Sequence, residues 1–141
     1  MELTQIYSNA IARVEADIKQ KYIQVTWLKH PKSEEFRDVH TNALSYAYEN
    51  HLTAWLCDMR QVSYLEVGDQ NWLVREIFSG FNPDMTHEFA FVVSHLGLEL
   101  MSSFRVHDLV RNDQELQKLI KTDIFLDIKS AQMWLFQMGE K

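Results

Sequence analysis

The run Phe89-Ala90-Phe91-Val92-Val93 is the longest uninterrupted apolar stretch of the chain, and it constrains the fold more than any other segment. A strand that is apolar at every position has two apolar faces, which is typical of a parallel strand covered on both sides of its sheet. Parallel strands need long crossover connections, and these are usually helices. The run therefore predicts an α/β domain with a strand from Glu88 to Val93 near the centre of the sheet.

The rest of the chain alternates between strand and helix patterns. Residues 11–18 and 22–28 each alternate apolar with polar side chains, which predicts an antiparallel hairpin closed by residues 19–21, although these lack an Asn-Gly turn signal. Ser33 is the expected N-cap of the first helix and Asp127 that of the last. The expected elements after the hairpin are a helix from 33, a strand at 53–57, a helix from about 69 to 81, the strand at 88–93, a helix from 97 to about 111, a strand at 123–126 and a terminal helix.

This order predicts one domain over residues 1–141, with a mixed, mostly parallel five-stranded sheet, an N-terminal antiparallel hairpin and about four helices. The 14 basic and 20 acidic residues give a net charge of −6, and the basic residues are dispersed. This distribution argues against binding to nucleic acid or to an anionic membrane surface.

The single cysteine, Cys57, lies in an apolar run and is expected to be a buried thiol, which favours a reducing compartment. The first twenty residues lack the apolar core of a signal peptide, and no apolar run is long enough to span a bilayer. We therefore expect a cytoplasmic protein without membrane insertion.

Ligands of open parallel sheets bind beyond the carboxyl ends of the strands, which here are residues 58–60 and 94–97. Arg60 has the planar fork that holds a carboxylate or a phosphate, helped by backbone amides near residues 68–70. The alternative is that Asp58 and Arg60 pair within their own loop. Asp69 is expected to be a helix N-cap rather than a ligand.

Enzymatic and cofactor sites have little support in the sequence. Ser94, His95 and Asp58 all lie at strand ends, but adjacent residues of an extended chain point to opposite faces, and no Gly-x-Ser-x-Gly elbow surrounds Ser94. The six histidines show no metal-ligand spacing, and the chain has neither a Gly-x-Gly-x-x-Gly motif nor a P-loop. We expect no catalysis, no metal and no cofactor.

The segment from Cys57 to Glu66 and the pattern from Phe125 to Leu135, in this order of elements, resemble a STAS domain of the SpoIIAA-like family over nearly the whole chain. The resemblance implies a non-enzymatic regulatory module, similar to anti-sigma factor antagonists, that binds a protein partner or a small ligand. Glu66 matches the acidic residue of the family's switch loop. Val67 and Gly68 stand where the phospho-acceptor serine is expected, whereas Ser63 lies at an earlier Thr or Ser position, so the serine that the family's kinase-controlled switch requires is missing from this place.

On this reading, binding takes place between Asp58 and Asp69 with support from the next loop. The expected site residues are Asp58, Arg60, Ser63, Glu66, Asp69, Ser94 and His95. Replacing Arg60 or Glu66 with alanine is then expected to weaken binding and to leave thermal unfolding nearly unchanged.

The alternative function is a hydrophobic-ligand carrier of the same broad fold group, with a lipid enclosed near Trp27, Trp55, Trp72 and Trp134. Core packing is the simpler explanation of these aromatic residues. A poorly covered apolar patch would instead serve as an interface with a protein partner or with a second copy of the chain.

Overall fold

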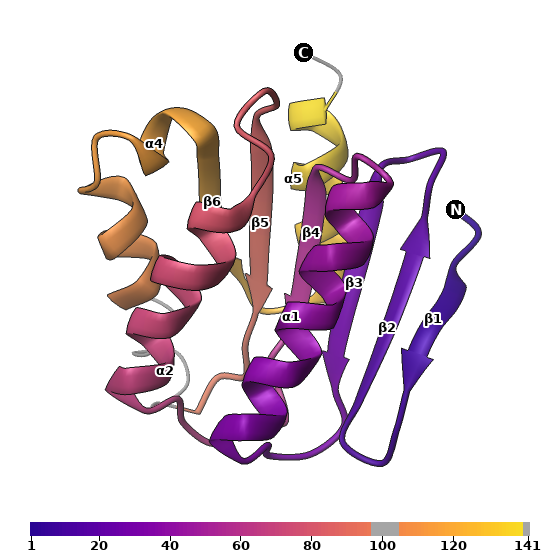
Figure 1. The fold of residues 1–141 in the computed structure, drawn as a ribbon. Coiled ribbons are helices and arrows are strands. Elements are labelled where there is room, and N and C mark those ends of the chain that lie inside the picture. Colours follow the sequence, from indigo (N-terminus) through magenta and orange to yellow (C-terminus); the bar gives the residue numbers. More distant parts are fainter. Residues whose placement is uncertain (97–104, 140–141) are drawn as a thin grey trace.

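The computed structural model describes residues 1–96 and 105–139 and shows an α/β domain built on one mixed sheet (Figure 1). The six strands lie side by side in chain order: β1 (Thr4–Ser8), β2 (Ala12–Asp17), β3 (Tyr22–Trp27), β4 (Ala54–Asp58), β5 (His87–Val92) and β6 (Ile120–Phe125). Strands β1 to β3 are antiparallel, and β3 to β6 are parallel. The prediction of a mostly parallel mixed sheet with an N-terminal antiparallel hairpin is confirmed.

The predicted number of strands was wrong, because the sheet has six strands and not five. The missed strand is β1, which pairs with β2 at the edge of the sheet. Its sequence, Thr-Gln-Ile-Tyr-Ser, is exposed at both ends and only partly buried at Ile6 and Tyr7, and its register shifts between Gln5 and Tyr7. An edge strand with polar residues and an irregular register lacks the alternation by which a strand is recognised in sequence.

The β2–β3 hairpin has the expected register, with Asp17 opposite Tyr22. Its turn contains Lys21 at a φ of 54°, in the left-handed region that glycine or asparagine usually occupies. The carbonyl of Lys21 accepts hydrogen bonds from the N–H groups of Thr53 and Ala54, at 3.0 and 2.9 Å. These bonds to the start of β4 support the turn that its own sequence does not favour.

Across residues 1–96 and 105–139, five helical segments connect or follow the strands. They are α1 (Ser33–Glu49), α2 (Val67–Trp72) with its π-helical continuation η1 (Leu73–Ile77) and 3-10 turn η2 (Phe78–Gly80), a helix at 105–111, the single turn α4 (Leu116–Leu119), and α5 (Ile128–Gly139). The expected start of the third helix, at 97, lies outside the described residues. The strand expected at 123–126 begins earlier, at Ile120.

Two of the three N-cap predictions need correction. The N-cap of α1 is Lys32 and not Ser33, and the N–H of Lys32 donates to Glu35 Oε1 at 2.8 Å. Asp69 lies within the first turn of α2, whose N-cap is Glu66. The prediction for Asp127 is confirmed, because its carboxylate accepts the N–H of Ser130 at 2.7 Å.

Helices cover both faces of the sheet, as the apolar run of β5 requires. Figure 1 shows α1 and α2 in front of the sheet and α5 behind it. The larger core lies on the α1 and α2 side, where Trp27, Trp55, Phe78 and Phe89 are buried. The smaller core joins α5 to the other face of β4 and β5 through Leu56, Ala90 and Leu135. Every residue of β5 is buried, as expected for an interior strand.

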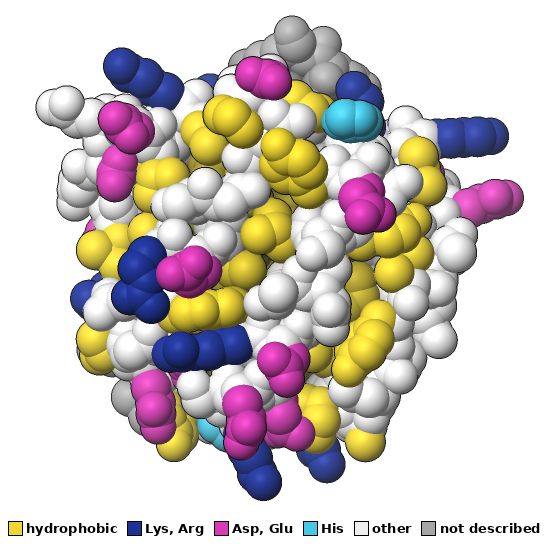
Figure 2. Space-filling view, in the orientation of Figure 1, with side chains coloured by type: hydrophobic (Ala, Val, Ile, Leu, Met, Phe, Trp, Pro, Cys, Tyr) yellow, Lys and Arg dark blue, Asp and Glu magenta, His cyan; other side chains and the backbone are white. Residues whose placement is uncertain are grey.

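The face that carries α1 and α2 shows no large area of one charge sign. Figure 2 shows acidic and basic side chains interspersed among apolar ones on this face. Among the residues that the structure describes, no helix has both the length and the apolar character needed to cross a membrane.

Candidate functional site

The candidate site lies at the edge where the four parallel strands end. Thr26, Asp58, Val92 and Phe125 form one row of neighbouring residues across β3 to β6. Beyond this row, the N–H of Met59 donates to Val92 O at 2.8 Å and the N–H of Val93 donates to Phe125 O at 2.9 Å. The loops that follow these strands therefore leave the sheet together, beside the first turns of α1 and α2 (Figure 1). We call this edge the carboxyl edge.

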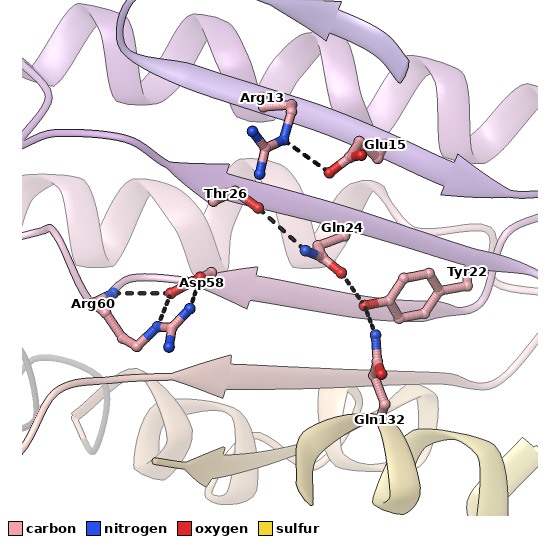
Figure 3. Close-up of polar contacts among 8 residues, drawn as sticks. All are labelled: Arg13, Glu15, Tyr22, Gln24, Thr26, Asp58, Arg60 and Gln132. Atoms are coloured by element: carbon pink, nitrogen blue, oxygen red, sulfur yellow. Dashed lines mark hydrogen bonds and ion pairs between the residues drawn. The ribbon is translucent and has the colours of Figure 1, made fainter. Parts of the chain in front are cut away.

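Asp58 and Arg60 form an ion pair at the end of β4 (Figure 3). Arg60 Nε donates to Asp58 Oδ1 at 2.9 Å and Nη2 to Oδ2 at 2.7 Å, while the N–H of Arg60 donates to Oδ1 at 3.2 Å. The hydrogen bonds to Asp58 raise the pKa of Arg60 above its ordinary value. Asp58 is buried and Arg60 is partly exposed, so the fork that we expected to hold an external anion is occupied by its own loop.

Asp69 connects the first turns of α1 and α2. Its Oδ1 accepts the hydroxyl of Ser33 at 2.6 Å and Nε of Arg37 at 2.9 Å. The guanidinium carbon of Arg37 also lies 5.4 Å from the ring centroid of Trp72, a cation–π contact. Because Asp69 is buried and its partners come from α1, its role is to fix the two helix starts relative to each other.

His30 connects the loop after β3 with the loop after β4. Its ring centroid lies 4.9 Å from that of Tyr64, and its Nδ1 accepts the N–H of Ser63 at 3.1 Å. A pocket of about 350 Å³ opens between these two loops. It is lined by His30, Pro31, Lys32, Ser33, Phe36, Tyr64, Leu65, Glu66 and Asp69.

The predicted site residues thus fall into separate parts of the carboxyl edge. Ser63, Glu66 and Asp69 lie in or beside the pocket, whereas Asp58 and Arg60 form their own pair. Ser94 Oγ accepts the N–H of Leu96 at 3.2 Å, and His95 is exposed. The carboxylate of Asp58 forms its ion pair with Arg60, so it does not orient His95 as the acid of a catalytic triad would.

Exposed apolar side chains at this edge were missed by the sequence reasoning. Large apolar residues that follow all four parallel strands remain exposed: Leu28 after β3, Tyr64 and Val67 after β4, Leu96 after β5 and Leu126 after β6. Leu96 is 77% exposed and Val67 57% exposed. The available signal was the apolar residue in each polar loop. The sequence reasoning placed the loops at 58–60 and 94–97 at this edge, but not the loops that carry Leu28 and Leu126.

A second group is fully buried and contains Cys57, whose predicted burial is confirmed, and His40, which the sequence reasoning missed. His40 Nδ1 lies 2.9 Å from Phe36 O, and His40 Nε2 lies 3.8 Å from the sulfur of Cys57. Burial lowers the pKa of His40 to about 4 and raises the pKa of the Cys57 thiol. A neutral thiol without solvent access is a poor nucleophile, so this pair is a structural part of the core.

A third group joins β3 to α5 through hydrogen bonds (Figure 3). Tyr22 donates its hydroxyl to Gln24 Oε1 at 2.5 Å, and Gln132 Nε2 donates to the Tyr22 hydroxyl at 3.3 Å. Gln24 Nε2 donates in turn to Thr26 Oγ1 at 3.3 Å. These bonds satisfy the buried polar side chains of Tyr22, Gln24 and Thr26, as burial of polar atoms requires.

Within residues 1–96 and 105–139, no group of three histidine, cysteine, aspartate or glutamate side chains is arranged to hold a metal ion. Comparison of the chain with protein-family models and with curated proteins found no match.

Proposed function

We propose that this protein is a non-enzymatic binding module of the SpoIIAA-like group of STAS domains, and that it recognises a protein partner at the carboxyl edge. The observation that carries the proposal is the set of exposed apolar side chains on all four loops of this edge. Isolated exposed apolar residues are common, but exposed apolar side chains on four loops of one edge, with Tyr64 among them lining a pocket, are typical of an interaction surface.

The chemistry of the edge favours a protein over an anionic membrane. Lys32 and Glu66, both exposed, line the same pocket, and Arg60 is neutralised by Asp58. A surface with balanced charges and apolar side chains is typical of protein interfaces. The apolar residues also extend over four loops, which is a wider area than one small molecule in the 350 Å³ pocket would contact.

The family assignment is supported by the order of the elements and by Glu66 at the start of α2. The proposal includes no serine switch at the helix start, because Val67 and Gly68 form its first two residues. Recognition is instead assigned to the exposed side chains of the loop, with Asp69 and Arg37 holding the helix starts in position.

A matched pair of tyrosines tests the proposal. Tyr64 is 46% exposed at the carboxyl edge, and Tyr48 is 48% exposed near the end of α1. Each is replaced in turn by the photo-crosslinking residue benzoylphenylalanine, and the protein is irradiated in its host cells. We expect a discrete protein adduct from position 64 and not from position 48. Absence of an adduct at 64, or the same adduct from both positions, would contradict the proposal.

Two further results separate the alternatives. If the adduct has twice the mass of the chain, the partner is a second copy. Native mass spectrometry of the protein from its host tests the carrier alternative, because a lipid-sized adduct would support it against the proposed module. In the structure, Trp27 stacks on Phe36 and Trp55 on Phe89, both at 5.6 Å between centroids, so these tryptophans pack as core residues.

A further inference from the structure

The outer side of β6 is an open edge of the sheet. Strand β6 pairs with β5 on one side, and in the described part of the chain no other strand pairs with it. The unpaired N–H and C=O groups of an edge strand are a template for another extended chain. Native proteins usually block such edges. Backbone groups of β6 that have no hydrogen-bond partner therefore indicate where another strand could pair.

The backbone N–H and C=O groups of β6 point alternately inward, toward β5, and outward, toward the open edge. The carbonyl of Phe125 accepts the N–H of Val93 and therefore points toward β5. Backbone groups alternate along a strand, so those of Ile120, Thr122 and Ile124 point outward. The N–H of Ile120 donates to Leu116 O, and the N–H of Ile124 donates to Asp123 Oδ1 at 2.8 Å. Thr122 is left with an outward N–H that donates to no described residue.

A groove of about 630 Å³ runs along this edge. Its floor includes four consecutive residues of β6, from Ile120 to Asp123. Consecutive side chains of a strand point to opposite faces of the sheet, so these four residues lie on both faces of β6. One groove can touch both faces only if it runs along the open edge of the strand. One wall is a face of the helix at 105–111, formed by His107, Val110 and Arg111, and the other includes Trp134 of α5.

The walls hold their positions through contacts to β6. His107 Nδ1 is hydrogen-bonded to Thr122 Oγ1, and the ring of Trp134 lies 5.6 Å from that of Phe125. An extended chain placed on β6 would direct its alternate side chains toward the helix at 105–111 and toward Trp134. Such a groove, between an edge strand and a helix, suits recognition by strand addition.

The groove carries a positive charge on an acidic protein. Its charged lining residues are Arg111, Lys121 and Asp123, whereas the whole chain has a net charge of −6. Glu88 is the neighbour of Lys121 on β5, but it lies one strand further in and outside the groove lining. Complementary charge therefore favours an acidic occupant.

We propose that β6 binds an extended acidic segment of a partner protein as a seventh strand, with a backbone hydrogen bond from Thr122 N–H, an apolar side chain against Trp134 and an acidic side chain near Arg111 or Lys121. This site is separate from the carboxyl edge and does not depend on the function proposed there.

The test uses the full chain and a short capped peptide of alternating valine and glutamate. Binding is measured by fluorescence anisotropy, and hydrogen exchange of the Thr122 amide by NMR. We expect the glutamate peptide to bind about tenfold or more tightly than its valine and lysine counterpart, a difference of about 1.4 kcal/mol. At saturation, exchange of the Thr122 amide should slow by about tenfold or more.

Two controls separate strand addition from simple charge attraction. A peptide N-methylated at every residue keeps its charge but has no backbone N–H to donate to the outward carbonyls of β6, so its binding should fall about tenfold. The double variant Arg111→Glu, Lys121→Glu should lose the preference for glutamate, whereas Lys19→Glu, Arg75→Glu, with the same change in net charge elsewhere, should keep it. Lack of peptide binding, unchanged exchange at Thr122, or equal binding of the N-methylated peptide would each overturn the proposal.

Discussion

Replacing Arg60 with alanine tests the energetic role of the ion pair at the end of β4. The substitution removes two side-chain hydrogen bonds, at 2.9 and 2.7 Å, from a carboxylate that is 5% exposed. The sequence alone led us to expect that this change would leave thermal unfolding nearly unaltered. The buried position of Asp58 changes that expectation, because an isolated buried carboxylate is costly.

The magnitude follows from the burial of the two partners. Exposed ion pairs contribute about 0–1 kcal/mol, whereas breaking a buried pair costs about 3–5 kcal/mol. Asp58 is buried and the side chain of Arg60 is 43% exposed. In the variant, water can therefore replace part of the stabilisation that the guanidinium gives to the Asp58 carboxylate. We expect Arg60→Ala to lower the free energy of unfolding by about 2 kcal/mol, which is about 6 °C in Tm for a chain of this size.

Urea unfolding followed by tryptophan fluorescence at pH 7 measures this loss. Arg13→Ala is the matched control, because Arg13 is 40% exposed and makes one bond, at 2.9 Å, to the partly exposed Glu15. It should cost about 0.5 kcal/mol or less. A double-mutant cycle with Asp58→Ala should show a coupling of about 1 kcal/mol or more. If Arg60→Ala costs no more than Arg13→Ala, the reasoning from burial is wrong.

Two further predictions concern the core. A Cβ on Gly80 would lie 2.9 Å from Leu44 Cδ2, so the end of that side chain must shift, whereas a Cβ on Gly68 would meet nothing within 4 Å. Gly68→Ala should therefore raise the free energy of unfolding by about 0.5 kcal/mol, and the Gly80→Ala variant should be less stable than the Gly68→Ala variant by about 1 kcal/mol. Equal effects in urea unfolding would refute this. Burial lowers the pKa of His40 to about 4 in the folded state, below the usual 6.5, so the unfolded chain binds the proton more tightly. Stability should therefore fall by about 3 kcal/mol between pH 6.5 and 4, and the fall should be smaller in His40→Gln; equal pH dependence of both proteins would contradict the assignment.

Elements with a clear periodic pattern were predictable. The apolar run of β5 required cover on both faces, and the structure supplies it with α1 and α2 on one side and α5 on the other. The alternation at residues 11–18 and 22–28 indicated β2 and β3, and Asp127 marked the start of α5. In the strands, burial acts on every residue or at a fixed period, and at Asp127 the cap is a local hydrogen bond that the residue type itself indicates.

Strand β1 and the roles of Asp69 and His30 were not predictable in this way. Asp69 had the composition of an N-cap, but its carboxylate accepts from Ser33 and Arg37 of another helix. His30 meets Ser63 and Tyr64 only because parallel strands bring their loops to one edge. These contacts join residues more than thirty positions apart, and neither partner's own segment specifies them.

The sequence by itself determined the class of the domain, because hydrophobic burial imposes local periods on strands and helices. The tertiary structure decided what the loops do. It paired Arg60 with Asp58, gathered exposed apolar side chains at the carboxyl edge, and left β6 open beside a positively charged groove. Such features depend on which strand ends and helix faces become neighbours, and the packing of the whole chain fixes that.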